Sequence, residues 1–276
     1  MKRLLLTLIL IVVLQPSSYA ALTAHWTLQD NAGNFTVAAA VGSGGTLEGG
    51  SFTSAVSNTP GPSSTLTRYF LLDGTDDYVS ATTGNTGATQ NKAILTLCCW
   101  FKVASGDTTG NHRLIFANNG TVLGTTRVLL GINTSGQLAC AARAGDGESA
   151  QAKTSSSSYD DNTWHHAAAV IDYANDTITL YIDGASVSST GTISFTGSAS
   201  SNTASLSVHL GKTQSGEFYK GGFADCRIYD SDESANLGSI MGVSNPVAKI
   251  LLQLSDARLR RQSKHFATYG VYALTP

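Results

Sequence analysis

The sequence predicts an all-β protein in which two antiparallel sheets pack face to face. Apolar and polar residues alternate with a period of two in many short segments, and turn residues separate these segments about every ten positions. Charged residues make up only 13% of the 276-residue chain and glycine occurs 28 times, a composition that favours sheets joined by many turns. At this length a sandwich with one apolar core is the simplest arrangement.

In the first half of the chain, residue alternation and turn signals define five strands. Leu22, Ala24 and Trp26 alternate with polar residues, and Asp73-Gly74 marks a turn between two hydrophobic runs. The expected strands cover residues 22–27, 46–48, 68–73, 78–80 and 94–103. The last of these is apolar on both faces, so we expect it at the centre of a sheet. One face carries Leu95, Leu97, Cys99, Phe101 and Val103, and the other carries Thr96, Cys98, Trp100 and Lys102.

The second half continues as short strands separated by Asn-, Asp-, Gly- and Ser-containing turns. Hairpins are expected among the first three strands and a meander among the next three. The expected strands cover residues 114–117, 128–132, 138–142, 164–172, 177–183, 185–189, 206–210 and 223–229. One short helix is expected at 233–241, near the C-terminal end of the sandwich.

The first twenty residues are expected to be a secretory signal peptide. Lys2 and Arg3 precede an apolar run at 4–14 that is too short to span a bilayer. Ser18 and Ala20 are small residues that fit a cleavage site after Ala20. The alternative is an uncleaved N-terminal anchor. No later segment is long and apolar enough to cross a membrane, so we expect a protein that is secreted or associated with the cell surface.

Charge divides the chain into a sandwich at 21–242 and a basic extension at 243–276. Residues 22–242 hold ten basic and eighteen acidic side chains, whereas the extension holds five basic and one acidic. The extension could dock on an acidic surface of its own chain or of a second copy, contact an anionic polymer, or remain solvated. The whole chain has a formal net charge of −2, which gives no general attraction to nucleic acid.

The four cysteines lack the paired short spacings of a zinc site. They are Cys98, Cys99, Cys140 and Cys226. An oxidising compartment permits a disulfide, and buried free thiols are the alternative. On a strand, the adjacent Cys98 and Cys99 point to opposite faces, so at most one of them can bond to a partner inside the same core. The sequence does not assign a pairing.

Four segments in order resemble the laminin-G-like, concanavalin A-like lectin/glucanase superfamily, and in particular its bacterial extracellular jelly-roll branch. The resemblance covers most of residues 22–241. The segments are 70–79 (FLLDGTDDYV), 95–102 (LTLCCWFK), the pair 164–166 (WHH) and 179–184 (TLYIDG), and 222–230 (GFADCRIYD). The resemblance implies a jelly-roll sandwich whose members mostly bind glycans or extracellular proteins.

Three functions are consistent with this resemblance. The leading hypothesis is a secreted, non-enzymatic recognition module that binds a carbohydrate or an extracellular protein through its loops or its concave sheet face. The second is a structural or assembly component of a surface, matrix or particle, in which the basic extension mediates self-association. The third is a glycoside hydrolase with an unrecognised carboxylate pair.

Catalytic and metal-binding signals are weak. The resemblance to glucanases would predict the run E-x-D-x-x-E, which is absent, and the glutamates Glu48, Glu148, Glu217 and Glu233 are scattered. We therefore expect no catalytic residues. His165 and His166 are adjacent on a strand and point to opposite faces, so they are not expected to share a metal ion, and His166 is expected to be structural.

The calcium ligand expected from the resemblance is also displaced. It would be an aspartate at the start of the closing strand, where this chain has Ala224, with Asp225 one residue later. Asp73, Asp76 and Asp77 could bind a hard cation, but turn geometry alone explains the Asp-Gly pair. We predict no metal site and no cofactor.

Glycan binding needs an exposed aromatic ring with hydrogen-bonding neighbours. Trp100, on the face that also carries Thr96, and Tyr219, in a glycine-rich loop, are the predicted ligand-binding residues. A structural role is the alternative for both.

Overall fold

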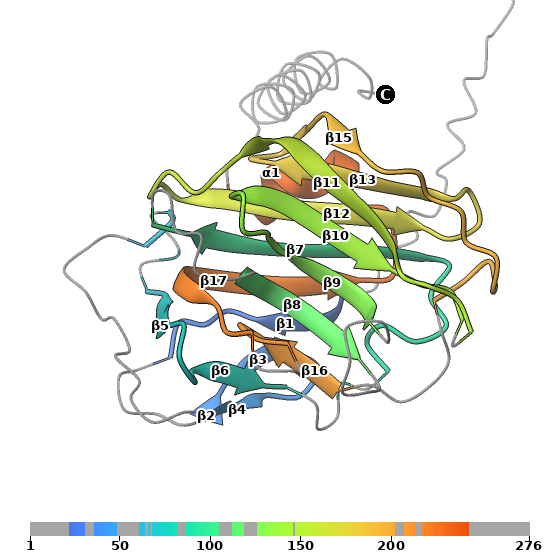
Figure 1. Ribbon diagram of the computed structural model, residues 1–276. Helices are drawn as coiled ribbons and strands as arrows, with labels where there is room; N and C mark the ends of the chain where they lie inside the picture. Colours follow the sequence, from blue (N-terminus) through green and yellow to red (C-terminus); the bar gives the residue numbers. More distant parts are fainter. Residues whose placement is uncertain are drawn as a thin grey trace, which may run out of the picture.

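The computed structural model confirms a two-sheet antiparallel sandwich (Figure 1). It describes residues 22–30, 36–48, 61–63, 66, 68–81, 85, 87–104, 112–118, 126–145, 147–201, 207–213 and 217–242. The expected leader and basic extension lie outside these residues. Within the described part of the chain, no helix has the length and apolar character that a membrane crossing requires.

The first sheet, here called the β7 sheet, has eight strands. Its order is β14-β13-β12-β7-β17-β1-β3, and β5 also pairs with β17. Its strands are β1 (Leu22–Trp26), β3 (Ala39–Val41), β5 (Phe70–Asp73), β7 (Ile94–Lys102), β12 (His165–Asp172), β13 (Thr177–Ile182), β14 (Ala185–Ser186) and β17 (Lys220–Tyr229). As expected from its two apolar faces, β7 lies inside the sheet, between β12 and β17.

The second sheet, here called the β9 sheet, has nine strands in the order β15-β11-β10-β9-β8-β16-β6-β4-β2. Its strands are β2 (Thr36–Val37), β4 (Gly45–Glu48), β6 (Tyr78–Ser80), β8 (His112–Asn118), β9 (Thr126–Ile132), β10 (Gln137–Ala142), β11 (Gln151–Ser158), β15 (Ser189–Thr190) and β16 (Ser207–Leu210). The hairpins expected between β8, β9 and β10 are present. Figure 1 shows β8, β9 and β10 lying over β7, β12 and β17.

Strand β11 was not expected from the sequence. It reads Gln-Ala-Lys-Thr-Ser-Ser-Ser-Ser and carries no apolar alternation, and Ser155 is its only buried residue. It pairs with β10 along most of its length and with the two-residue β15 at its outer edge. Backbone hydrogen bonding to an established neighbour, rather than side-chain burial, therefore makes this segment a strand.

The main core fills the space between the sheets and uses the alternate residues of β7 that the sequence indicated. Leu95, Leu97, Cys99, Phe101 and Val103 are all fully buried there. The opposite face of β7 is covered as well, by the 3-10 turn η2 (Ser234–Asn236) and by α1 (Leu237–Ile240). Cys98 packs with Leu237 and Ile240, and Trp100 packs with Met241. This cover explains why both faces of β7 are apolar.

All four cysteines are buried and none is in a disulfide. Cys99, Cys140 and Cys226 belong to the main core, whereas Cys98 belongs to the small cluster on the outer face of the β7 sheet. The expected divergence of Cys98 and Cys99 is thus observed.

A bulge interrupts β17 opposite Cys99. Trp100 pairs with Ala224 and Cys98 pairs with Arg227, so Asp225 and Cys226 together face the single residue Cys99. Asp225 has a left-handed backbone with φ of 54°, a conformation that Asp and Asn adopt more readily than most residues. The extra residue turns its carboxylate to the outer side of the sheet.

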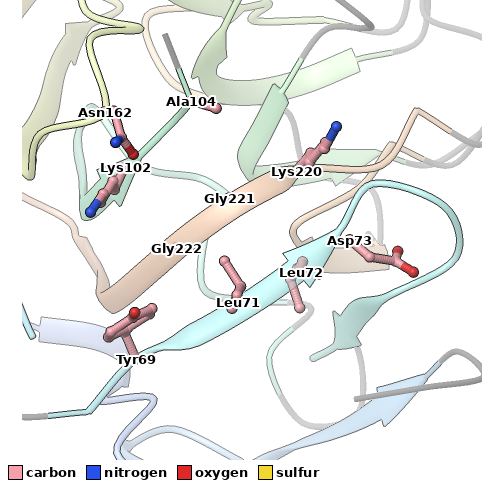
Figure 2. Close-up of a pocket in the computed structure, with 10 residues that line it drawn as sticks. All are labelled: Tyr69, Leu71, Leu72, Asp73, Lys102, Ala104, Asn162, Lys220, Gly221 and Gly222. Carbon is pink, nitrogen blue, oxygen red and sulfur yellow. The ribbon is translucent and has the colours of Figure 1, made fainter. Parts of the chain in front are cut away.

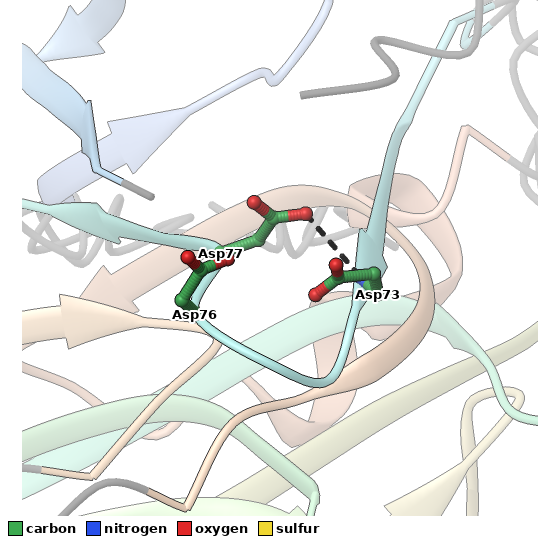
Figure 3. A group of neighbouring side chains, drawn as sticks. All are labelled: Asp73, Asp76 and Asp77. Atoms are coloured by element: carbon green, nitrogen blue, oxygen red, sulfur yellow. Dashed lines mark hydrogen bonds between the residues drawn. The ribbon is translucent and has the colours of Figure 1, made fainter. Parts of the chain in front are cut away.

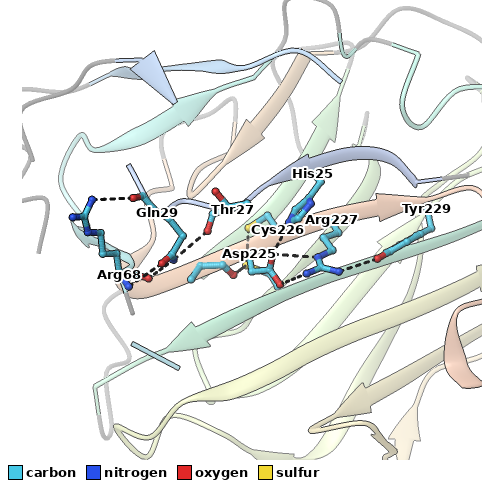
Figure 4. Close-up of polar contacts among 10 residues, drawn as sticks. His25, Thr27, Gln29, Arg68, Asp225, Cys226, Arg227 and Tyr229 are labelled. Atoms are coloured by element: carbon cyan, nitrogen blue, oxygen red, sulfur yellow. Dashed lines mark hydrogen bonds and ion pairs between the residues drawn. The ribbon is translucent and has the colours of Figure 1, made fainter. Parts of the chain in front are cut away.

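The Asp225 carboxylate is the centre of a buried ion-pair network (Figure 4). Oδ1 lies 2.6 Å from Nε2 of His25 and accepts a 3.1 Å hydrogen bond from Nε of Arg227, while Oδ2 accepts a 2.8 Å bond from Nη2. Burial alone would raise the pKa of this carboxyl, but the His25 hydrogen bond and the Arg227 charge outweigh burial and lower the pKa. Asp225 therefore forms an ion pair with Arg227 within the sheet.

Replacing the charge of Asp225 should destabilise the sandwich. We expect Asp225→Asn, which retains the left-handed backbone, to lower the free energy of unfolding by about 3 kcal/mol, because it removes a buried carboxylate and leaves the partly buried Arg227 guanidinium without its counter-charge. Because the folded-state pKa is lowered, the stabilisation is present above about pH 4 and is lost as the pH falls. Urea unfolding between pH 3 and 7 measures both effects.

A matched control is Asp230→Asn, which removes the partly exposed partner of Lys92 at 3.3 Å. That change should cost less than about 1 kcal/mol. Equal effects of the two substitutions would contradict the assignment of Asp225 as a buried structural charge.

Candidate functional site

An open cleft of about 470 Å³ lies on the outer face of the β7 sheet (Figure 2). Strands β5, β17 and β7 supply most of its lining residues, and the adjoining segments supply Tyr69, Ala104 and Asn162. The lining residues are Tyr69, Leu71, Leu72, Asp73, Lys102, Ala104, Asn162, Lys220, Gly221 and Gly222. None of them was predicted as a ligand-binding residue.

Strand β5 provides an apolar wall because it carries an apolar residue, Leu71, at a position that points out of the core. Phe70 and Leu72 point into the core, so Tyr69, Leu71 and Asp73 point outward. Leu71 is 42% exposed and is the only large hydrophobic residue exposed in the described part of the chain. Leu71 is therefore an apolar side chain accessible from an open cleft whose other lining residues include lysine, aspartate and asparagine side chains.

The floor of the cleft depends on the absence of a side chain at Gly222. A Cβ atom there would lie 2.9 Å from the Trp164 ring and 3.1 Å from the Tyr69 ring. These two rings instead close over β17, edge to face, with centroids 4.9 Å apart. Gly222 therefore lets this aromatic wall, formed by Tyr69 in the cleft lining and by Trp164 beside it, approach the sheet.

Tyr219 lies beneath this floor, inside the core. Its side chain is fully buried, and its hydroxyl donates to the Gly222 carbonyl at 2.7 Å and accepts from the Lys102 N–H at 3.2 Å. The ring has no exposed face in the structure. In the structure, the Tyr219 hydroxyl links β17 to β7 directly behind the cleft. A role of Tyr219 in ligand contact stays a prediction.

Trp100 lies on the outer face of the β7 sheet, as its alternation predicted, but only 7% of it is exposed. It packs in a small cluster with Tyr69, Ala224 and Met241, against which Leu66 and Trp164 also pack. Its ring meets His166 edge to face, with centroids 5.3 Å apart. Trp100 thus supports the aromatic wall from behind, and its predicted ligand contact is likewise untested.

The polar groups of the cleft are of mixed charge. Lys220 begins the strand that carries Gly221 and Gly222, and Lys102 lies on the neighbouring strand β7, opposite Gly222 (Figure 2). Lys220 is directly opposite Asp73 in the β5–β17 register, and Asn162 adds an amide from the loop before β12. Together these groups offer hydrogen-bond donors and acceptors around the exposed Leu71 side chain.

The turn after β5 holds the cluster of three carboxylates noted in the sequence (Figure 3). Ligand atoms of Asp73, Asp76 and Asp77 all lie within 4.8 Å of one another, a spacing that a hard cation could bridge. The Asp73 side chain accepts the Thr75 N–H at 2.7 Å, and Asp77 accepts the Asp73 N–H at 3.3 Å. These two hydrogen bonds stabilise the turn, so turn geometry alone explains the Asp-Gly pair, as the sequence indicated.

The adjacent histidines diverge as expected and have different environments. His165 Nδ1 lies 2.8 Å from Asp183 Oδ2, and Nε2 lies 3.3 Å from Asp161 Oδ2. The Asp183 hydrogen bond is the largest cause of a raised His165 pKa. His166 is fully buried, and desolvation lowers its pKa to about 4, so it is neutral at physiological pH. This environment fits a structural His166.

The scattered glutamates lie in different parts of the described structure. Glu48 is on β4, and Glu148 accepts hydrogen bonds from the Ala144 N–H in its own loop and from the Thr196 N–H in a distant segment. Glu233 is buried and accepts hydrogen bonds from Ser231 and Asn236 just before α1. Glu233 thus holds the local structure before α1, and Glu148 links its own loop to the segment that contains Thr196.

Two antiparallel sheets packed face to face place this chain among the two-sheet sandwiches of the all-β class. The chain belongs to the concanavalin A-like lectin/glucanases superfamily, because the laminin-G profile of that superfamily matches residues 73–236, more than half of the chain. A search among curated proteins finds no match.

Several solved structures are similar to this chain at low sequence identity. Domain 4 of AbnA, an extracellular arabinanase from Geobacillus stearothermophilus in complex with arabinotriose, is 15% identical over 80% of this chain and 98% of that chain, with a TM-score of 0.51. The binding domain of botulinum neurotoxin serotype D/C is 13% identical over 81% of this chain and 52% of that chain, with a TM-score of 0.53. The Ruminococcus gnavus IT-sialidase CBM40 bound to α2,3-sialyllactose is 18% identical over 63% of this chain and 95% of that chain, with a TM-score of 0.47.

The hydroxyl of Tyr219 should stabilise the cleft. We expect Tyr219→Phe to lower the free energy of unfolding by about 1–2 kcal/mol, because the buried Gly222 carbonyl and the partly buried Lys102 N–H lose their partner. The Lys102 amide should also exchange its hydrogen faster. Urea unfolding and amide hydrogen exchange measure these effects.

Tyr173→Phe is the matched control for this prediction, because the Tyr173 hydroxyl is buried without a hydrogen-bond partner in the structure. Its removal should be neutral or slightly stabilising. Indistinguishable effects of the two substitutions would argue against the Tyr219 link.

The raised pKa of His165 should depend on Asp183. We expect Asp183→Asn to bring the His165 pKa down toward about 6.5, its ordinary value. The stabilisation from a protonated His165 is full below about pH 6.5 and is lost as the pH rises through the raised folded-state pKa. A proton NMR titration of the His165 ring tests this, and an unchanged midpoint in the variant would assign the shift to another group.

Proposed function

We propose that the chain is a secreted, non-enzymatic recognition module that binds a carbohydrate in the cleft between β5, β17 and β7. The observation that carries the proposal is the exposed Leu71 in a concave site with polar groups around it. The volume of about 470 Å³ lies within the ~300–1,000 Å³ range of small-ligand pockets.

The chemistry of the cleft fits a sugar. A pyranose or furanose ring has an apolar face of C–H groups and an edge of hydroxyls. The apolar face can pack on Leu71 and the edge of Tyr69, while the hydroxyls exchange hydrogen bonds with Asn162, Lys102 and Asp73. This arrangement combines apolar contact with directional hydrogen bonds, which together set orientation and specificity.

The structural relatives support this proposal in one respect. The arabinanase domain, whose fold this chain shares along most of its length, is described in complex with arabinotriose. A sandwich of this kind can therefore hold a short oligosaccharide. Export, which the leader predicts, would place the cleft where extracellular glycans occur.

Trp100 and Tyr219 contribute to this proposal from behind the cleft. Trp100 packs against Tyr69, and Tyr219 is hydrogen-bonded to Gly222 and Lys102. We propose that both residues affect carbohydrate affinity by fixing the cleft walls.

Carbohydrate binding should depend on the cleft residues. On a glycan array, we expect saturable binding by the wild type and about tenfold weaker binding after Leu71→Ser or Lys102→Ala, each of which removes on the order of 1.4 kcal/mol of contact energy. Both side chains are at least partly exposed, so stability should change little. Isothermal titration calorimetry with the best array ligand measures the affinities.

Lys153→Ala is the matched control, since Lys153 is a partly exposed lysine on β11 in the other sheet. It should bind like the wild type, and no variant or wild type should release reducing sugars from the same glycans. Absence of glycan binding by the wild type, or equal losses in the Lys102 and Lys153 variants, would rule out this site. Release of reducing sugars would instead support the hydrolase hypothesis.

A further inference from the structure

Two cysteines from neighbouring strands meet inside the core. The sulfur of Cys99 on β7 lies 2.6 Å from the sulfur of Cys226 on β17, and both residues are fully buried. All four cysteines are within the described residues, and this is the one pair whose sulfurs are in contact. The residues are 127 positions apart in the sequence.

The bulge in β17 brings the sulfurs of Cys99 and Cys226 together. Gly222 pairs with Lys102, Phe223 with Phe101 and Ala224 with Trp100. Continued without a bulge, that register would place Asp225 opposite Cys99. The extra residue instead shifts the register by one, so that Asp225 turns to the outer face and Cys226 faces Cys99 from the core side.

The two remaining cysteines are poorly placed to compete. Cys98 is on the outer face of the β7 sheet, among Ala168, Leu237 and Ile240. Cys140 is on β10 in the opposite sheet. Neither sulfur has a sulfur neighbour in the structure.

We propose that Cys99 and Cys226 form a disulfide that joins the two central strands of the β7 sheet. In the balanced reaction, the two thiols lose two protons and two electrons and form one S–S bond. The oxidant is a disulfide, either of a small molecule such as oxidised glutathione or of a thiol–disulfide exchange protein, and it is reduced to two thiols. One cysteine first forms a mixed disulfide with the oxidant, and the other then displaces the oxidant's second thiol.

The bond should form during folding rather than afterwards. Burial raises the pKa of the Cys226 thiol well above its ordinary value, and the reactive species is the thiolate. In the folded core the pair is therefore protected from reagents. While the chain is still open, both sulfurs are accessible to the oxidant.

The link would support the cleft as well as the core. It lies three positions along β7 from Lys102 and four along β17 from Gly222, so it would tether the strands that carry one wall and the floor. Closing a long loop in the unfolded chain would also reduce its entropy. The disulfide does not depend on the proposed carbohydrate ligand, and each can fail without the other.

The test is thiol counting on the full chain, refolded with a mixture of reduced and oxidised glutathione and then denatured and alkylated with iodoacetamide. We expect two alkylated cysteines in the oxidised protein and four after reduction. Thermal unfolding of the oxidised form should occur about 10 °C higher than that of the reduced form. Four alkylated cysteines after oxidative refolding would overturn the proposal.

Variants identify the pair even if some of them fold poorly. The double variant Cys98→Ala/Cys140→Ala keeps only the proposed partners and should have no free thiol after oxidative refolding. Cys226→Ala should have three free thiols, and the Cys99–Cys226 cross-link should be found by mass spectrometry of peptides from the Cys98→Ala variant. Two free thiols in the double variant, or a cross-link that persists in Cys226→Ala, would exclude the assignment.

Discussion

The antiparallel pairing of β7 with β17 is the constraint on which the rest of the structure depends. These strands are adjacent in the sheet although more than a hundred residues separate them. Strand β17 also pairs with β1 and β5, so it aligns the first, middle and last parts of the sandwich. The core face of the pair carries Cys99, Phe101 and Phe223, and the outer face carries Trp100 and the floor of the cleft. An error of one residue in this register would exchange the two faces.

The bulge at Asp225 shows how a single extra residue reconciles two chemical requirements. A carboxylate facing the core would be costly, because burial penalises the charged form. With the bulge, Asp225 faces His25 and Arg227, and Cys226 takes the core position. Paired charge is thus kept on the outer face and apolar sulfur in the core. The bulge thus gives a structural role to Asp225, which lies one residue after the position at which the sequence resemblance led us to expect an aspartate.

The cleft illustrates why function is argued from a site rather than from a fold. Sandwiches of this superfamily carry different activities, so the fold alone does not decide among them. What distinguishes this chain is local: an outward Leu71 in a strand whose neighbouring residues point into the core, a glycine that admits two aromatic rings, and a buried tyrosine that fixes the strands behind them. These features convert one end of a sheet into a concave surface with an apolar centre.

The sequence by itself determined the fold class and most strands, because period-two alternation is a local property that burial between two layers enforces. It also separated Cys98 from Cys99 and His165 from His166, since neighbours on a strand face opposite ways. It could have indicated Leu71, the apolar residue at an outward position of an alternating segment. It did not predict β11, whose polar residues form a strand only because β10 pairs with them. The enclosure of Tyr219, the cover over Trp100 and the meeting of Cys99 with Cys226 were decided by the tertiary structure, because each depends on strands distant in the chain and on a bulge that local periodicity does not reveal.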